Sequence, residues 1–258
     1  MTTRRNLILG GAAVAALAGV AGAWRLGGWL TPVPTYQALA DLPPFRELAT
    51  QGAISGAGSA MVGLATGTQN DQADMPDHVA DVRANLCAAL FGQWTPGPVP
   101  IAFFTDVNCP NCRLMEAVIA EIAQDTPGRF RLIRHEYPLL GPTSEMAARA
   151  MLAAEKQGGA ELLQARFSRS RMVTDDDYIR AIASQLGLDA DRLISDMASP
   201  AVTQRLMTSK AVGKVFGFYG TPNTLVGRTL VIGAVPKAQL QAIIADESVL
   251  PIPECPKV

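Results

Sequence analysis

The pattern of apolar and polar residues predicts a β-α-β unit in the middle of the chain. Val99 to Phe104 is a short continuous apolar run, which is typical of a strand buried on both faces. A helix is predicted from Pro110 to about Gln124, and a second strand from Phe130 to Tyr137. The helix is expected to bury one stripe of side chains, formed by Leu114, Val118 and Ile122. Two strands joined by a helix in this way are expected to lie parallel in one sheet.

Helical periodicity continues from Pro142 to Phe216, and the chain then returns to strands. Helix starts within this block are marked by Thr174 with Asp177, by Asp189, and by Ser199 before Pro200. Thr224–Val226 and Thr229–Ile232 flank a Gly-Arg pair at residues 227–228 that is typical of a two-residue hairpin turn. Pro236 then opens a last amphipathic helix. The order β-α-β, helices, β-β-α predicts an α/β fold.

The sequence before this unit, residues 31–97, carries a weaker pattern. It starts with a proline-rich stretch, and one helix is predicted from Pro76 to Phe91, with Pro76 in its first turn. A Pro-Gly-Pro sequence at residues 96–98 marks a boundary. We therefore predict a partly helical N-terminal extension ahead of a domain formed by residues 98–258.

The first 30 residues have the organisation of an export signal. Arg4 and Arg5 precede an uncharged stretch that is rich in leucine, alanine, glycine and valine and reaches Ala23. The paired arginines resemble a twin-arginine signal, and the small residues that end at Ala23 form a candidate cleavage site. A retained membrane anchor that extends to Leu30 is the alternative. In both cases the rest of the chain is expected in the periplasm, where disulfides persist.

Composition excludes several classes of protein. The 258 residues include 48% hydrophobic residues, enough for an extensive core, and the formal net charge is −1. Since no run of Lys and Arg interleaved with aromatics occurs, nucleic acid is not an expected partner. The 4 cysteines are too few for a disulfide scaffold, so each needs its own explanation.

Two of these cysteines lie where the predicted central strand gives way to a helix. Cys109 precedes Pro110, which takes the first helical position, and Cys112 follows one turn later. Unpaired N–H groups and the helix dipole favour an anion at such a site, so the pKa of the Cys109 thiol is expected to fall. Cys109 would then be the exposed nucleophile, and Cys112 the resolving thiol.

Two other uses of the pair compete with redox chemistry. One cysteine pair supplies half of a tetrahedral zinc site, and no second close pair is formed by Cys87, Cys255, His78 and His135. A purely structural disulfide would close a very short loop and remove little chain entropy. The position between a strand and a helix favours redox chemistry, because that is where a thiolate is activated.

Three features together resemble the DsbA-type thiol-disulfide oxidoreductases, which are thioredoxin-fold proteins of the bacterial periplasm. They are Phe103–Asp106 followed by Cys109-Pro110-Asn111-Cys112, the segment His135–Gly141, and Gly220-Thr221-Pro222. The resemblance covers about residues 99–245 and implies a thioredoxin-like fold with a helical insertion at about residues 142–217. It does not extend to residues 31–97.

The resemblance also implies roles for residues around the cysteine pair. It implies a cis peptide bond between Thr221 and Pro222, placed against the Cys109 sulfur, where the Thr221 backbone could pair with an extended substrate strand. An ordinary turn before a strand is the alternative interpretation of this dipeptide. Pro110 and Asn111 would tune the redox poise of the cysteines that flank them.

Four further side chains carry weaker expectations. Asp106 is a candidate for proton exchange with Cys112, although a solvated carboxylate at a strand end is the simpler interpretation. His135 is expected to be a half-exposed residue at a strand end, since a thiolate at a helix start needs no histidine base. An even number of cysteines suggests that Cys87 and Cys255 form a disulfide, with a buried free thiol at Cys87 as the alternative.

The sequence therefore predicts a periplasmic thiol-disulfide oxidoreductase that needs no bound cofactor. The simplest function is a dithiol oxidase for exported cysteine-containing proteins, recycled by a redox partner in the membrane. A reductase or isomerase of the same fold is the first alternative, including a homo-oligomer formed through residues 31–91. A metal chaperone that uses the two cysteines as soft ligands is the second.

Overall fold

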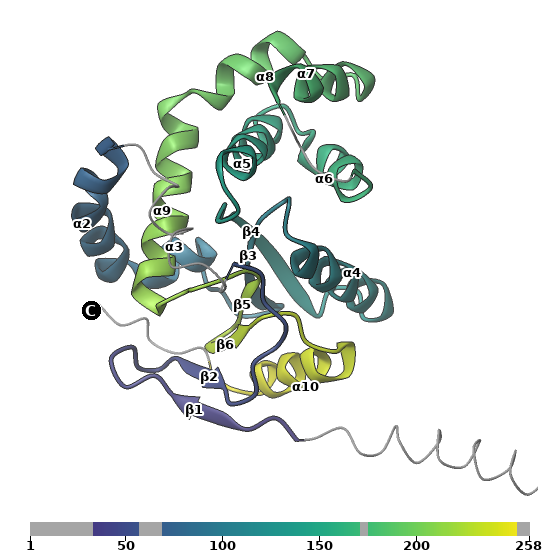
Figure 1. The fold of residues 1–258 in the computed structure, drawn as a ribbon. Helices are drawn as coiled ribbons and strands as arrows, with labels where there is room; N and C mark the ends of the chain where they lie inside the picture. The colour runs from purple at the N-terminus through teal and green to yellow at the C-terminus, as the bar shows by residue number, and fades with distance from the viewer. Residues whose placement is uncertain (1–32, 57–68, 171–174, 252–258) are drawn as a thin grey trace, which may run out of the picture. The chain divides into compact units, whose positions relative to one another are not determined.

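Strand β3, Val99–Thr105, is an inner strand of a six-stranded sheet, and all 7 of its residues are buried. In this computed structural model, which describes residues 33–56, 69–170 and 175–251, the strand order is β1-β2-β6-β5-β3-β4 (Figure 1). The other strands are β1 Tyr36–Ala38, β2 Arg46–Leu48, β4 Phe130–Glu136, β5 Asn223–Val226 and β6 Thr229–Ile232. β3 pairs parallel with β4 and antiparallel with β5, as the predicted order of elements requires.

The helices of the described residues follow the predicted order. Helix α4, Pro110–Asp125, connects β3 to β4, and α10, Lys237–Ser248, follows the β5–β6 hairpin. The others are α2 Gln69–Ala84, α3 Leu86–Phe91, α5 Pro142–Glu155, α6 Ala160–Ser168, α7 Asp176–Gln185, α8 Ala190–Met197 and α9 Pro200–Phe216. The chain therefore has the thioredoxin-like α/β fold that the resemblance implied, with helices α5 to α9 inserted between β4 and β5.

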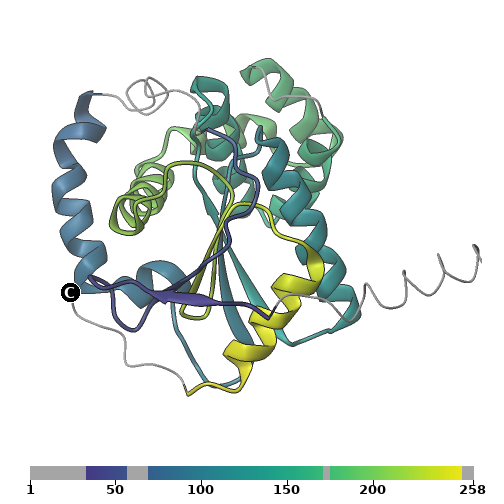
Figure 2. The same cartoon turned by 60° about the horizontal axis from the view of Figure 1, so that its bottom comes forward.

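Side chains of β3 alternate between two apolar layers. Ile101 and Phe103 pack with residues of α4 and α10, whereas Ala102 and Phe104 pack with residues of α3 and α9. Figure 2 shows the helices on the two sides of the sheet. Because helices cover both faces of the sheet, the strand is apolar at every position instead of at every second one. This explains the continuous apolar run in the sequence.

The inserted helices have a core of their own. Leu163, Phe167, Ile179 and Leu193 are fully buried there, together with small side chains of α5. Asp189 and Ser199 cap α8 and α9 as predicted, since their side chains accept hydrogen bonds from the backbone N–H groups three residues later. The insertion is therefore held together largely by its own apolar contacts.

Two strands that the sequence pattern does not predict extend the sheet. β1 pairs antiparallel with β2, and β2 pairs parallel with β6. Arg46 of β2 forms an ion pair with Glu247 of α10 at 2.9 Å, and Glu247 also pairs with Arg228 at 3.2 Å. Only 1% of the Glu247 side chain is exposed, so the carboxylate is buried while the two arginines keep part of their surface in contact with solvent. Strands β1 and β2 of the extension ahead of residue 98 are thus part of the same sheet, and the chain from Thr35 onward forms one compact unit.

The predicted helix from Pro76 to Phe91 is wrong in its bounds. It consists of α2 and α3, with a break at Asn85, and Pro76 lies inside α2 instead of in its first turn. Helix α2 packs against α9. This tertiary contact outweighs the local preference of proline for a helix start.

Two smaller predictions about helices also need correction. The N-cap of α7 is Asp175, whose carboxylate accepts the Tyr178 N–H at 2.8 Å; Thr174 lies outside the described residues. On α4, Leu114 is 61% exposed. The stripe that faces the sheet is rotated from the predicted one and contains Cys112, Met115, Ile119 and Ile122.

The predicted export signal, residues 1–30, also lies outside the described residues. Within the ranges that the structure describes, no helix combines the length and the apolar character needed to cross a bilayer. The choice between a cleaved signal and a retained anchor therefore stays a prediction.

Candidate active site

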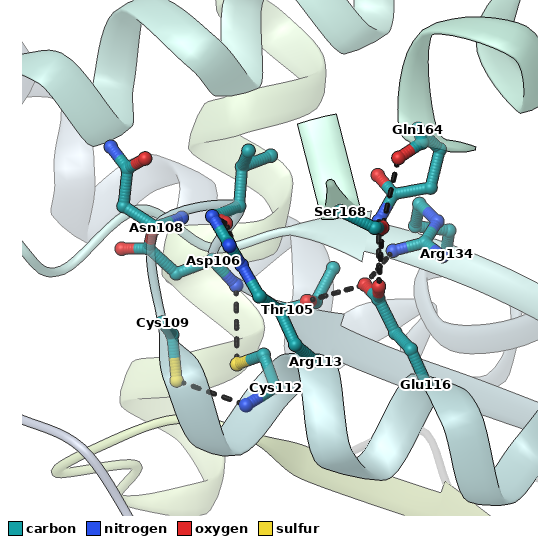
Figure 3. Close-up of polar contacts among 11 residues, drawn as sticks. Thr105, Asp106, Asn108, Cys109, Cys112, Arg113, Glu116, Arg134, Gln164 and Ser168 are labelled. Atoms are coloured by element: carbon teal, nitrogen blue, oxygen red, sulfur yellow. Dashed lines mark hydrogen bonds and ion pairs between the residues drawn. The ribbon is translucent and has the colours of Figure 1, made fainter. Parts of the chain in front are cut away.

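Cys109 is the N-cap residue of α4. Its backbone is extended (φ −81°, ψ 119°), and its sulfur accepts a hydrogen bond from the Cys112 N–H at 3.1 Å (Figure 3). Pro110 takes the first helical position, where its missing N–H costs no hydrogen bond. The sulfur therefore occupies the place of a capping oxygen, at the positive end of a 16-residue helix.

This environment lowers the pKa of the Cys109 thiol from 9.0 to about 6. The largest cause is a hydrogen bond from the Cys112 side chain; burial acts in the opposite direction, and the polar side chains of Ser55 and Thr221 and the Cys112 backbone N–H lower the pKa further. At neutral pH Cys109 is therefore mostly a thiolate, which is the nucleophilic form of cysteine.

The second cysteine has the opposite character. Burial raises the pKa of the Cys112 thiol far above its ordinary value, and the hydrogen bond to Cys109 and the negative charge of Cys109 act in the same direction. The Asp106 backbone N–H donates a hydrogen bond to the Cys112 sulfur, with 3.5 Å between N and Sγ. The pair thus contains one thiolate and one thiol, the asymmetry that a nucleophile and a resolving cysteine require.

The loop before β5 lies against the Cys109 sulfur. The Thr221–Pro222 peptide bond is cis, and the Thr221 carbonyl oxygen is 3.6 Å from Cys109 Sγ. Ser55 forms an antiparallel bridge with Thr221: the Thr221 N–H donates to the Ser55 carbonyl at 2.9 Å, and the Ser55 N–H donates to the Thr221 carbonyl at 2.8 Å. Asn111 donates from Nδ2 to the Ser55 hydroxyl at 2.9 Å. The sequence alone gave no sign that Ser55 reaches this site.

Asp106 is buried, not solvated as its position at a strand end suggested. One carboxylate oxygen accepts the Asn108 N–H at 2.9 Å, and the other accepts the N–H groups of Leu139 and Leu140 at 2.8 and 3.0 Å. The backbone N–H of Asp106, and not its carboxylate, makes the contact with Cys112. This carboxylate therefore fixes the loops beside the cysteine pair, and its exchange of a proton with Cys112 stays a prediction.

The contacts of His135 give its ring a structural role. It is half-buried, its Nε2 is 2.8 Å from the Leu90 carbonyl oxygen, and its ring stacks on Phe104 with centroids 4.4 Å apart. Burial lowers its pKa to about 4, so the ring is neutral at pH 7. These contacts are consistent with the expectation that His135 is not the base.

A polar cluster one helical turn beyond Cys112 was not predicted from the sequence. The Glu116 carboxylate forms an ion pair with Arg134 at 2.7 Å and accepts hydrogen bonds from Thr105, Gln164 and Ser168 (Figure 3). Burial opposes the charge on Arg134, but the negative charges of Glu116 and Glu136 raise its pKa, and the Cys112 sulfur contributes in the same sense. The sequence signal was the spacing of Glu116, four residues after Cys112 on the same helix face.

The structure also shows the bonding state of the described cysteines and bears on a metal site. Cys109 and Cys112 are free thiols, and Cys87 is disulfide-bonded. Because Cys255 lies outside the described residues, its pairing with Cys87 stays a prediction. In the ranges with described side chains, no group of three or more His, Cys, Asp or Glu residues could hold a metal ion.

Comparison with known proteins identifies this arrangement. Residues 100–245 match the family of DSBA-like thioredoxin domains. The chain belongs to this family. It is therefore a thiol-disulfide oxidoreductase of the DsbA-like type, and proteins of this type act on substrate proteins by thiol-disulfide exchange.

Solved structures of similar proteins agree with the family assignment. A thioredoxin-like oxidoreductase from Silicibacter pomeroyi DSS-3 is 34% identical, with a TM-score of 0.58, over 62% of this chain and 95% of that one. A thiol-disulfide exchange protein from Wolbachia pipientis, α-DsbA2, shares the fold at 20% identity and a TM-score of 0.55, over 70% of this chain and 99% of that one.

One curated relative is much longer than this chain. The Na⁺/H⁺ antiporter NhaA of Herminiimonas arsenicoxydans is 36% identical over 91 residues, which are 34% of this DsbA-like chain and 14% of the antiporter. The similarity thus concerns a small part of that protein.

Proposed function

We propose that this DsbA-like protein is a dithiol oxidase that introduces disulfides into exported proteins. The observation that carries the proposal is the capping position of Cys109, which lowers the pKa of its thiol to about 6. A thiolate stabilised in this way favours the reduced form of the pair and so raises its reduction potential. The oxidised pair would therefore accept electrons readily from substrate thiols.

The reaction is an exchange of disulfide partners. A substrate thiolate attacks Sγ of Cys109 in the Cys109–Cys112 disulfide, a mixed disulfide forms, and Cys112 leaves and takes up a proton. A second substrate thiolate then attacks the substrate sulfur of the mixed disulfide, and Cys109 leaves as a thiolate. The substrate loses two electrons and the cysteine pair gains them, so a redox partner in the membrane must reoxidise the pair.

The location and assembly of the protein belong to the same proposal. The apolar N-terminal sequence with its paired arginines supports export to the periplasm, either with cleavage near Ala23 or with a retained anchor. A reductase or isomerase would use the same chemistry in the opposite direction, including as a homo-oligomer formed through residues 31–91. A measured reduction potential separates the two directions, because strong oxidants have far higher potentials than reductases.

The proposed roles of the cysteines are tested by trapping substrates. In Cys112→Ala the resolving thiol is absent, so mixed disulfides with exported proteins should accumulate on Cys109. Cys109→Ser is the matched control and should trap nothing, because Cys112 is buried and protonated. If Cys112→Ala carries no adducts in the periplasm, the proposed exchange mechanism is wrong.

A further inference from the structure

The proposed nucleophile cannot be reached by a protein substrate in the conformation described. Cys109 has 0% of its surface exposed, although attack by a substrate thiolate requires access to its sulfur. On one side, the Thr221 carbonyl oxygen lies 3.6 Å from the sulfur, and Ser55, which helps to lower the pKa of Cys109, is paired with Thr221 through two backbone hydrogen bonds. Some part of the surrounding structure must therefore move before exchange can begin.

The Thr221 backbone is also occupied. An extended peptide that adds to this edge would pair with the N–H and the carbonyl of Thr221, and both groups are already bonded to Ser55. Ala53 forms a second antiparallel bridge, with Ala234, and Gly52 donates its N–H to the Ile232 carbonyl at 2.7 Å. Residues 52–55 thus lie along the sheet as an added strand would.

Glycines allow this segment to come close to the domain. A Cβ atom on Gly52 would lie 2.2 Å from the Ala234 carbonyl oxygen, and one on Gly220 would lie 2.8 Å from the Ser55 carbonyl oxygen. Gly233, with φ +84°, faces the Gly52 backbone at distances that also exclude a side chain. Because backbone atoms come this close, any side chain at these three positions would clash. Glycine at all three therefore allows residues 52–55 to pack against the domain.

We propose that residues 52–55 act as an internal pseudosubstrate, which fills the strand position of a protein substrate and is displaced when a substrate binds. Ser55 stands in for the substrate cysteine, from which it differs only by an oxygen in place of sulfur. The proposal rests on the proposed function and specifies its substrate: an extended, unfolded segment that pairs antiparallel with Thr221. A folded protein that cannot offer such a strand would leave the pseudosubstrate in place.

Hydrogen exchange on a mixed disulfide tests the displacement. The full-length Cys112→Ala protein is allowed to react with a peptide whose cysteine is already in a mixed disulfide with a small aromatic thiol; the Cys109 thiolate attacks the peptide sulfur and the aromatic thiolate leaves. Exchange of individual amides in this adduct is compared with that of the free protein. In the free protein the amides of Ser55 and Thr221 should both be protected, since both donate backbone hydrogen bonds. In the adduct the Thr221 amide should stay protected by the peptide, and the Ser55 amide should lose its protection by at least about tenfold.

The outcomes separate the two proposals. Failure of Cys109 to form the adduct would contradict the proposed function and the pseudosubstrate together. An adduct in which Ser55 stays as protected as before would overturn only the pseudosubstrate, because the segment would then be a permanent part of the site. An unprotected Ser55 amide in the free protein would overturn it as well.

A pair of variants gives a kinetic test. Ser55→Pro removes the N–H that donates to the Thr221 carbonyl, whereas Ser55→Ala keeps both backbone hydrogen bonds and removes only the hydroxyl. At a pH where Cys109 is fully ionised in every variant, Ser55→Pro should accelerate adduct formation with the peptide by roughly threefold to tenfold. Ser55→Ala reports the effect of losing the hydroxyl alone, so the acceleration in Ser55→Pro is measured relative to Ser55→Ala. Equal rates for the Pro and Ala variants would contradict displacement as a step before exchange.

Discussion

Removal of the Cys112 side chain should raise the pKa of Cys109, because the hydrogen bond from Cys112 is the largest cause of its low value. With a pKa of about 6, roughly 90% of Cys109 is thiolate at pH 7; with the ordinary value of 9.0 the fraction would be about 1%. If Cys112→Ala raises the pKa by about two units, the thiolate fraction at pH 7 falls to roughly 10%. Alkylation at pH 7 should then slow by about tenfold.

The assay follows the rate of alkylation by iodoacetamide, together with the ultraviolet absorbance of the thiolate, as a function of pH. The matched control is Cys112→Ser, which keeps a hydroxyl donor and should retain most of the low pKa. If Ala and Ser variants both titrate near pH 6, the donor on Cys112 is not the cause. If the parent protein itself shows no transition below pH 8, the electrostatic account of the site is wrong.

The lowered pKa of Cys109 also makes the reduction potential of the cysteine pair depend on pH. Because the pKa of Cys109 is lowered on folding, stabilisation of the reduced protein is fully present above pH 9 and is lost as the pH falls to about 6. At pH 7 it amounts to at most about 1.4 kcal/mol, since solvent screens part of the interaction, and this corresponds to about 30 mV in reduction potential. The capping position of Cys109 alone therefore raises the reduction potential of the cysteine pair by only a modest amount.

Three further predictions concern buried carboxylates. Asp106→Asn should lower the free energy of unfolding by about 1–3 kcal/mol in urea titrations, because its carboxylate accepts three backbone N–H groups and an amide would turn a donor toward one of them. Burial raises the pKa of Glu136 from 4.5 to about 8, so stability should fall as the pH rises between these values, and Glu136→Gln should abolish that fall. Glu247→Ala should lower the free energy of unfolding by about 3–5 kcal/mol, since it leaves two arginines without their buried partner; Lys237→Ala, which breaks exposed pairs with Glu121 and Asp125, should lower it far less.

The sequence predicts best where local and tertiary preferences agree. The continuous apolar run of β3, the capping residues Asp189 and Ser199, and the position of Cys109 at the start of α4 are predicted correctly, whereas the expectation that Cys109 is exposed is wrong, because the sulfur is buried. Each of these depends on neighbours within a few residues in the chain. The fold and the identity of the candidate nucleophile follow from such local signals.

Features that depend on distant contacts were missed. β1 and β2 are each 3 residues long, and β2 is fixed in the sheet by β6 and by the ion pair of Arg46 with Glu247. Ser55 lies in a stretch rich in glycine and alanine, and only the fold brings it to Thr221. Pro76 was placed at a helix start because local preference cannot register the packing of α2 on α9.

Transfer of a disulfide to a reduced protein is the most direct test of the central claim. The oxidised full-length chain is mixed with an equimolar amount of a reduced, unfolded protein that contains two cysteines, and the thiols of both proteins are counted over time. One disulfide should form in the substrate for each Cys109–Cys112 pair reduced, and Cys109→Ser should transfer none. A substrate that stays reduced while the Cys109–Cys112 disulfide persists would contradict it.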